Sequence, residues 1–223
     1  MSRIAMEGKV LSENERVAAE LRERFHHNQM FCANLISSPG SGKTSLLEGT
    51  LAGFAPEDRV AVLTGDIQTD NEARRLSGFG FPVKQITTGG ACHLDARMIQ
   101  RALKDWDLGA LDILFIENVG NLVCPVSYDL GECHKIAVLS VTEGEDKPLK
   151  YPATFLKADL MILNKIDLLP YVRFSLDLAR NNARKVHPEI EIIEVSCTTG
   201  QGFDRWRQWL EKSRANVSSL CLA

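Results

Sequence analysis

The chain has 223 residues, of which 44% are hydrophobic and 25% charged, and its formal net charge is −3. This composition is that of a globular protein long enough for a full hydrophobic core, and it lacks the basic stripe that would favour nucleic acid or an anionic membrane as partner. No apolar run approaches the roughly 18 residues of a membrane span, and residues 1–9 lack the apolar core of a signal peptide. We therefore expect a cytoplasmic protein in which residues 1–223 form a single domain.

Residues 13–27 predict an amphipathic helix. Ser12 and Glu15 have the spacing of a capping box, and apolar residues then recur at helical intervals. We expect this N-terminal segment, residues 1–28, to pack on the domain that follows it.

The stretch 31–44 predicts a P-loop. An apolar run at 31–36 is followed by small residues and then by a helical pattern, and the sequence departs from G-x-x-x-x-G-K-[ST] only at Ser37. Small residues let backbone N–H groups approach phosphates, and the helix N-terminus adds its positive end. Lys43 would neutralise phosphate charge, and the Thr44 hydroxyl would ligate Mg²⁺. The residues expected at the phosphates are Gly40, Ser41, Gly42, Lys43, Thr44 and Ser45.

Strands and helices alternate along the rest of the chain. Apolar runs that predict strands occupy residues 59–64, 83–87, 112–116, 135–142, 160–163 and 190–195. Helical patterns lie between or after them, at residues 43–53, 69–77, 94–104, 174–186 and 202–214. Strands without polar alternation predict a parallel sheet that is buried on both faces. We therefore predict an α/β fold of the P-loop NTPase type, with three layers and a mostly parallel sheet of about seven strands, and with ligands at the carboxyl ends of the strands.

The segment Asn164-Lys165-Ile166-Asp167 follows one of these strands and has the form N-K-x-D. The Asp167 carboxylate would accept hydrogen bonds from N1–H and the 2-amino group of guanine. Adenine offers neither donor, so it would leave a buried carboxylate unpaired. Together with the P-loop, this motif favours GTP over ATP. After the last strand, Ser196 and Cys197 begin a turn that would either close over the same base or be an ordinary connection to the next helix.

Acidic residues follow two other strands. Glu117-Asn118-Val119-Gly120 has the form of the D-x-x-G switch of GTPases, with glutamate in place of aspartate. Glu117 would bind Mg²⁺ directly or through water, and the Gly120 N–H would sense the γ-phosphate. Asp66 would either bind Mg²⁺ or orient the attacking water. We expect Lys43, Asp66 and Glu117 to carry nucleotide hydrolysis.

Cys92, His93 and Cys124 predict a second site at the same edge of the sheet, because both segments follow strands that end there. Thiolate and imidazole ligands suit Zn²⁺ or Ni²⁺. From spacing alone the signal is weak, since most Cys-His dipeptides bind nothing. Three ligands from one chain would be completed by water or by cysteines of a second subunit. Cys133-His134 precedes a strand, so we expect it at the opposite end of the sheet.

Together these motifs resemble the hydrogenase-maturation nickel-insertion GTPases of the HypB family, in the SIMIBI class of P-loop GTPases. The resemblance covers roughly residues 30–210 and is carried by the segments at 38–44, 90–96, 116–125 and 164–170. The segments at 90–96 and 116–125 are the specific ones, because generic GTPases lack them. Some members carry an N-terminal Cys-x-x-Cys site or a His-rich tract, and residues 1–30 here contain neither.

The resemblance implies a slow GTPase that serves as a metallochaperone. It implies that Lys43, Thr44, Asp66 and Glu117 serve phosphate and Mg²⁺, and that Asn164, Lys165 and Asp167 select guanine. It further implies nickel or zinc at Cys92, His93 and Cys124, a homodimer that depends on nucleotide or metal, a small zinc-binding maturation partner, and the large subunit of [NiFe]-hydrogenase as target. Lys147 would either reach nucleotide across the dimer or be a solvated loop lysine.

Because Glu117 and Cys124 lie on one short segment, a shift at Gly120 in response to the γ-phosphate would move a metal ligand. We therefore expect nucleotide state to control metal binding. The alternatives are an accessory GTPase for urease or for a cobalamin-dependent mutase, and a metal-binding protein without catalysis.

Overall fold

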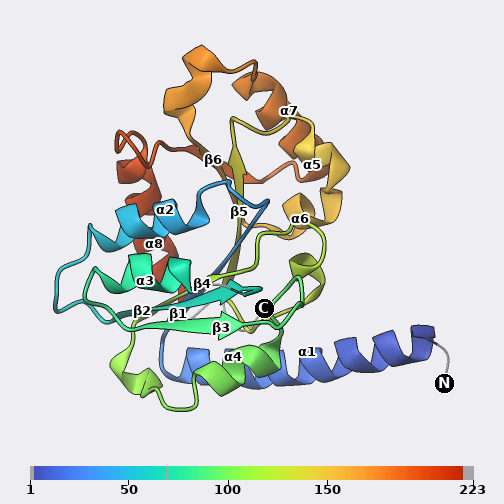
Figure 1. Ribbon diagram of the computed structural model, residues 1–223, viewed down its shortest axis with the longest axis vertical. Helices are drawn as coiled ribbons and strands as arrows, with labels where there is room; N and C mark the ends of the chain where they lie inside the picture. Colours follow the sequence, from blue (N-terminus) through green and yellow to red (C-terminus); the bar gives the residue numbers. More distant parts are fainter. Residues whose placement is uncertain (1–2, 69, 218–223) are drawn as a thin grey trace.

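The computed structural model describes residues 3–68 and 70–217 (Figure 1). Within these residues seven strands form one sheet in the order β3-β2-β4-β1-β5-β6-β7, and all neighbouring strands are parallel. The strands are β1 (Phe31–Ser37), β2 (Val60–Asp66), β3 (Val83–Thr87), β4 (Ile113–Glu117), β5 (His134–Ser140), β6 (Leu160–Asn164) and β7 (Glu191–Glu194). The predicted α/β fold and its seven parallel strands are confirmed.

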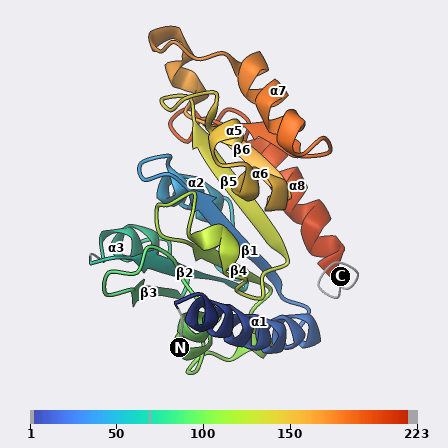
Figure 2. The same ribbon diagram turned by 90° about the vertical axis from the view of Figure 1, so that its right-hand side faces the viewer.

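Helices cover both faces of the sheet (Figures 1 and 2). Successive side chains of a strand point to opposite faces, so Phe31, Ala33 and Leu35 of β1 join one apolar cluster and Cys32 joins another. The first face packs against α2 (Lys43–Leu51), α3 (Asn71–Ser77) and α8 (Phe203–Ala215). The second face packs against α1 (Arg3–His27), α4 (Ala96–Ala102), α6 (Pro152–Lys157) and α7 (Leu176–Val186).

The N-terminal helix is longer than its sequence signals indicate. The capping box at Ser12 and Glu15 was expected to begin a helix, but α1 runs without interruption from Arg3 to His27. Residues 3–11 contain no proline and only one glycine, so nothing in them stops the helix from extending past the cap signal. Figure 1 shows α1 beside α4, and Val17, Leu21 and Phe25 of α1 are buried in the cluster between them.

Two short helices between β5 and β6 were not predicted. They are α5 (Lys147–Lys150) and α6, and each carries a proline in its first two positions. Proline interrupts a helix interior but fits its first turn, so Pro148 and Pro152 are compatible with helices that begin at these positions. The remaining predicted elements differ from the structure only in their ends. Three short 3₁₀ turns complete the description: η1 (Leu108–Ala110), η2 (Pro125–Ser127) and η3 (Ile166–Tyr171).

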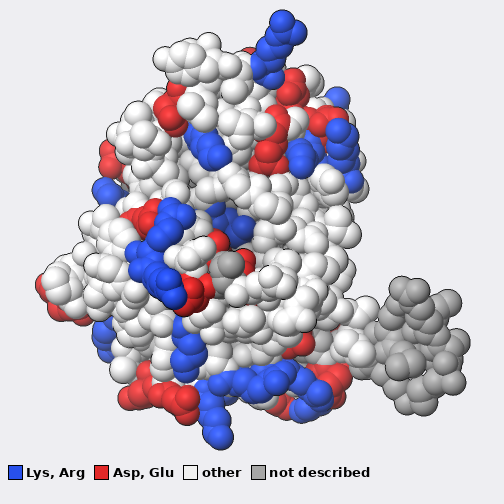
Figure 3. All heavy atoms as spheres, in the orientation of Figure 1, with Lys and Arg blue, Asp and Glu red and all other residues white. Residues whose placement is uncertain are grey.

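The sheet places its switch point at β1. The strands β2, β3 and β4 lie on one side of β1, and β5, β6 and β7 lie on the other. The connections of the chain therefore run to opposite sides of this strand. Such a reversal opens a crevice at the carboxyl ends of the strands, where ligands of doubly wound sheets bind. On the face shown in Figure 3, lysine and arginine side chains are interspersed with aspartate and glutamate. Among the described residues no helix combines the length and the apolar character needed to cross a bilayer.

Candidate nucleotide and metal sites

A cavity of about 260 Å³ lies at the carboxyl end of β1, between the P-loop and the ends of β2 and β4. We call it the phosphate cavity, because the P-loop forms one of its walls. Gly40 and Gly42 both have positive φ, at 75° and 97°, which lets the loop turn its backbone into the first turn of α2. Lys43 begins α2, is buried, and donates from Nζ to Ser37 Oγ at 2.8 Å. Ser37 therefore fits at the position of the missing glycine, because its hydroxyl holds the lysine head. Burial lowers the pKa of Lys43.

Oxygen ligands suited to Mg²⁺ meet in this cavity. Thr44 Oγ1 donates to Glu117 Oε1 at 2.7 Å, while Glu117 Oε2 is buried without a hydrogen-bond partner. Burial raises the pKa of Glu117, which a bound cation would reverse. Asp66 lines the same cavity and accepts a hydrogen bond from the Gln68 N–H at 2.8 Å. A hydroxyl with one or two carboxylates is a ligand set that Mg²⁺ favours, so these residues fit that ion.

Gly120 lies against the P-loop. A Cβ atom at Gly120 would come within 2.9 Å of the Cα of Pro39, closer than real Cβ contacts allow. The segment after β4 and the loop that would hold the phosphates are therefore in direct contact, as a γ-phosphate sensor requires.

A second cavity, of about 300 Å³, lies on the other side of the P-loop and is lined by the N-K-x-D residues. We call it the base cavity, after the base that this motif is expected to bind. Asn164 Nδ2 donates to Ser41 O at 2.9 Å, and Lys165 Nζ donates to Gly40 O at 2.7 Å. Asn164 and Lys165 therefore brace the backbone of the P-loop. Asp167 accepts a hydrogen bond from Ser196 Oγ at 2.6 Å.

The turn that begins at Ser196 lies beside the cavity of the N-K-x-D residues. Cys197 and Thr198 line it, and the Cys197 thiol donates to Asn164 Oδ1 at 3.2 Å. Burial raises the pKa of Cys197 to about 11. Ser45 also lines this cavity, and its hydroxyl accepts a hydrogen bond from Arg75 at 3.1 Å.

Glu143 is a site residue that sequence reasoning missed. It follows β5, and its Oε1 lies 2.7 Å from Ser41 Oγ and accepts the Ser140 N–H at 3.0 Å. Lys147 Nζ lies 3.3 Å from Glu143 Oε2 and donates to Ser38 Oγ at 3.2 Å. Lys147 is therefore anchored on the P-loop of its own chain and is not a solvated loop lysine. Nothing in the spacing of Glu143 marks it, because only folding brings it to Ser41.

Cys92, His93 and Cys124 meet at the same edge of the sheet, where they form what we call the thiol–imidazole cluster. One ligand atom from each lies within 4.8 Å of the other two, and all three residues are half-buried. Burial lowers the pKa of His93, which favours the neutral imidazole that metals require. A hydrogen bond with the Cys92 thiol, and then burial, raise the pKa of Cys124. Two thiols and an imidazole in this arrangement fit Zn²⁺ or Ni²⁺ with one position left open.

Two neighbours of the thiol–imidazole cluster hold its ligands in place, and neither was predicted. The Tyr128 ring stacks on the His93 ring, with centroids 3.7 Å apart and 20° between the planes. Asn121 Oδ1 accepts from the N–H groups of Val123 and Cys124, at 2.7 and 3.3 Å, and so forms the turn that presents the Cys124 thiol.

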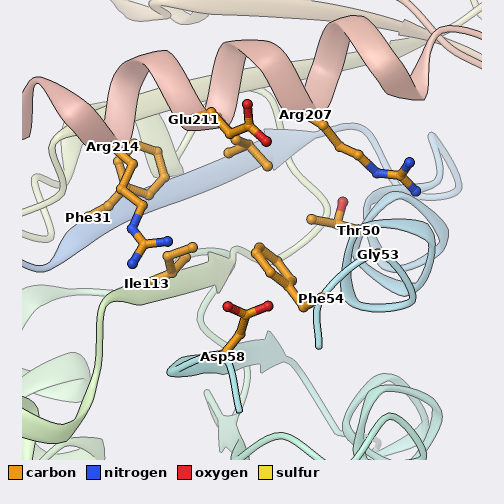
Figure 4. Close-up of a pocket in the computed structure, with 10 residues that line it drawn as sticks. Phe31, Thr50, Gly53, Phe54, Asp58, Ile113, Arg207, Glu211 and Arg214 are labelled. Atoms are coloured by element: carbon orange, nitrogen blue, oxygen red, sulfur yellow. The ribbon is translucent and has the colours of Figure 1, made fainter. Parts of the chain in front are cut away.

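The opposite end of the sheet holds none of the predicted ligand-binding residues. A cavity of about 230 Å³ lies there between α2, α8 and the starts of β1 and β4 (Figure 4). Its apolar side chains include Phe31 and Phe54, and Asp58, Arg207 and Arg214 surround them. His134 is the first residue of β5, so Cys133-His134 lies away from the thiol–imidazole cluster, as predicted.

The fold and the phosphate cavity together define a P-loop nucleotide-binding protein. The family described as CobW/HypB/UreG, nucleotide-binding domain, matches residues 32–194. The hydrogenase maturation factor HypB of Escherichia coli K12 is 54% identical over 211 residues, which cover 95% of this chain and 73% of that protein.

Two solved structures are similar over nearly the whole chain. Helicobacter pylori HypB in complex with nickel has a TM-score of 0.86 and 43% identity, and the match covers 93% of this chain and 98% of that one. HypB from Archaeoglobus fulgidus has a TM-score of 0.85 and 37% identity, with 91% and 99% covered. This chain belongs to the HypB family of hydrogenase maturation factors.

Proposed function

We propose that the chain is a GTP-hydrolysing metallochaperone that binds nickel and assists its insertion into the large subunit of [NiFe]-hydrogenase. The position of the thiol–imidazole cluster, at the sheet edge that also carries the phosphate and base cavities, is the observation that carries this proposal. GTP would occupy the two cavities, and nickel would be the cargo of Cys92, His93 and Cys124. The names of the HypB relatives and the nickel complex of the H. pylori protein support this role.

Hydrolysis would use the residues of the phosphate cavity. Thr44 and Glu117 would hold Mg²⁺, which supplies neutralisation of charge at the β- and γ-phosphates. Lys43, already buried beside Ser37, would be kept protonated by the phosphates and would stabilise the charge that builds up on the bridging oxygen. Asp66 would orient the attacking water or join the cation ligands. Attack on the γ-phosphorus breaks its bond to the bridging oxygen and releases GDP and phosphate.

Nucleotide state would reach the metal through residues 117–124. The Gly120 N–H would contact the γ-phosphate, and loss of that phosphate would let the segment move away from Pro39. Cys124 would move with it. We include in the proposal a cytoplasmic homodimer, formed with nucleotide or metal, in which a second subunit would complete the coordination, and a small zinc-binding partner in maturation.

Urease is a second candidate target. A Helicobacter hepaticus relative that is 44% identical over 95% of this chain is named a hydrogenase/urease maturation factor. The nucleotide and metal chemistry would be the same for both targets. Adding the nickel-loaded protein to apo-hydrogenase and to apo-urease, and measuring which enzyme becomes active, separates them.

The proposal is tested by nickel titration and GTP turnover on the same preparations. We expect Cys124→Ala to weaken nickel binding by about 100-fold or more, and Lys43→Ala to abolish turnover while nickel still binds. His93→Ala should also weaken nickel binding. His27→Ala is the matched control for this variant, because His27 is an exposed imidazole at the end of α1 and should leave nickel binding unchanged. Equal nickel affinity in wild type and Cys124→Ala, or no GTP turnover with Mg²⁺ in wild type, would contradict the proposal.

A further inference from the structure

The loop that carries Cys92 and His93 is fastened to β4 by one side chain. Asn118, the residue after Glu117, accepts hydrogen bonds at Oδ1 from the Leu94 N–H at 3.1 Å and from the Val119 N–H at 3.0 Å. Asn118 is only 1% exposed, so water cannot replace either bond. The backbone next to His93 therefore follows the position of the residue next to Glu117.

Asn118 also faces the phosphate site. It is one of the residues that line the phosphate cavity, and its Nδ2 donates to Asn34 Oδ1 at 3.2 Å. Asn34 lies on β1, the strand that leads into the P-loop, and its Nδ2 donates to Glu132 Oε1 at 3.0 Å. One buried amide thus contacts both the central strand and the metal-ligand loop.

Leu94 adds a second contact between that loop and the nucleotide side. Its side chain lies over Gly65, where a Cβ atom would come within 2.7 Å of Leu94 Cδ1. Gly65 immediately precedes Asp66 at the end of β2. The loop is therefore held against the ends of both strands that supply acidic residues to the phosphate cavity.

Cys124 is anchored separately. Its turn is formed by Asn121, and the carbonyl of Leu122 accepts a hydrogen bond from Thr154 Oγ1 of α6 at 2.5 Å. Gly120 lies between the anchor at Asn118 and the turn at Cys124. The cluster therefore consists of two parts, one fixed to Asn118 and one beyond Gly120, and a movement at Gly120 changes the distance between them.

We propose that Asn118 is the positioning residue that makes nickel affinity depend on the bound nucleotide. The inference rests on the proposed function. Asn118 holds Cys92 and His93 in register with Glu117, so that the displacement of Cys124 by the γ-phosphate switch opens or closes the ligand set. Without this anchor, the Cys92-His93 loop would shift together with Cys124 or independently of it. The nickel affinity would then no longer depend on the bound nucleotide.

The test compares nickel dissociation constants with GDP and with a non-hydrolysable GTP analogue. We expect the ratio of the two constants to differ from one in wild type and to fall to within about twofold of one in Asn118→Ala. Asn14→Ala is the matched control. Asn14 is buried on α1, its Oδ1 accepts the Ala96 N–H at 2.8 Å, and its Nδ2 donates to Asp129 O at 2.9 Å. This variant removes a buried hydrogen bond at the start of α4, two residues beyond Leu94, and leaves Asn118 untouched, so it should keep the wild-type ratio.

A second measurement needs no variant. Hydrogen exchange in wild type, without nickel, should be the same with GDP and with the analogue for the peptide spanning residues 91–96, because the Leu94 amide stays bonded to Asn118, and should differ between the two states for residues 120–126, which carry Cys124. Exchange at residues 91–96 that differs between the two states would overturn the inference, and so would a wild-type ratio that persists in Asn118→Ala. A wild-type ratio of one would overturn both this inference and the coupling in the proposed function, whereas the first two outcomes leave the proposed function standing.

Discussion

Replacing Asp167 by asparagine should exchange guanine for xanthine as the preferred base. In the structure one carboxylate oxygen of Asp167 accepts from Ser196 Oγ at 2.6 Å, and the side chain lines the base cavity. The carboxylate can accept from both N1–H and the 2-amino group of guanine. Asparagine can accept from only one of them and turns its own NH₂ toward the other donor.

The expected loss follows from these bonds. A hydrogen bond to a charged group contributes about 1.5–3 kcal/mol, so losing one and weakening the other costs about 3–5 kcal/mol. This corresponds to a GDP affinity that falls by about 10²- to 10⁴-fold. Xanthine carries a carbonyl at C2, which accepts from the asparagine NH₂, so affinity for xanthosine diphosphate should rise in the variant.

The assay is a titration of wild type and Asp167→Asn with GDP and with xanthosine diphosphate. Asp177→Asn on α7 is the control, because it makes the same chemical change at a side chain that is 87% exposed. A GDP affinity that falls less than fivefold, or a variant that gains nothing for the xanthine nucleotide, would refute the assignment of Asp167 to the base.

Three other predictions concern the same edge of the sheet. Gly120→Ala should lower the rate of GTP turnover by about 10- to 100-fold, because the new Cβ would meet Pro39 at 2.9 Å; unchanged single-turnover rates would show that this approach is not needed. Glu143→Gln should lower the free energy of unfolding by about 1–3 kcal/mol through its lost ion pair with Lys147, and an unchanged urea midpoint would contradict this. Alkylation of Cys197, whose pKa is raised to about 11, should accelerate about tenfold per pH unit from pH 7 to 10, and a rate that levels off between pH 9 and 10, as for an unshifted thiol, would refute the shift.

The sheet and its ligand-binding edge could be predicted from the sequence for a physical reason. Strands buried on both faces appear as continuous apolar runs, and the polar residue that ends each run lies at the carboxyl edge. The signals at Lys43, Glu117 and Asp167 each follow such a run. The meeting of Cys92 and Cys124 followed from the same rule, because both of their segments leave the sheet at that edge.

What could not be predicted depends on contacts between residues far apart in the chain. Tyr128 stacks on His93, and Glu143 accepts a hydrogen bond from Ser41. No pattern of spacing in the sequence indicates that either pair is in contact. Asn118 was visible only as an unmarked position inside a switch motif, although its amide joins β4 to the loop at Leu94. Local signals also failed where the chain context outweighed them, as at the capping box of Ser12 inside α1.

The two sites share one segment because of where β4 lies in the sheet. β4 is next to β1, so its end at Glu117 must face the P-loop, and it is also next to β2, which β3 follows at the edge. The loop after β3 therefore returns across the end of β4, where Leu94 meets Asn118. On the other side of β1, the loop after β5 also reaches the P-loop, through Glu143, but it leads to α5 and α6 and carries no thiol or imidazole. A metal site placed there would be as close to the P-loop, but none of its ligands would lie on the segment that begins at Glu117, the proposed Mg²⁺ ligand. On the β3–β4 side, by contrast, Asn118 lies next to Glu117, the proposed magnesium ligand, and holds the loop of the proposed nickel ligands Cys92 and His93 in place.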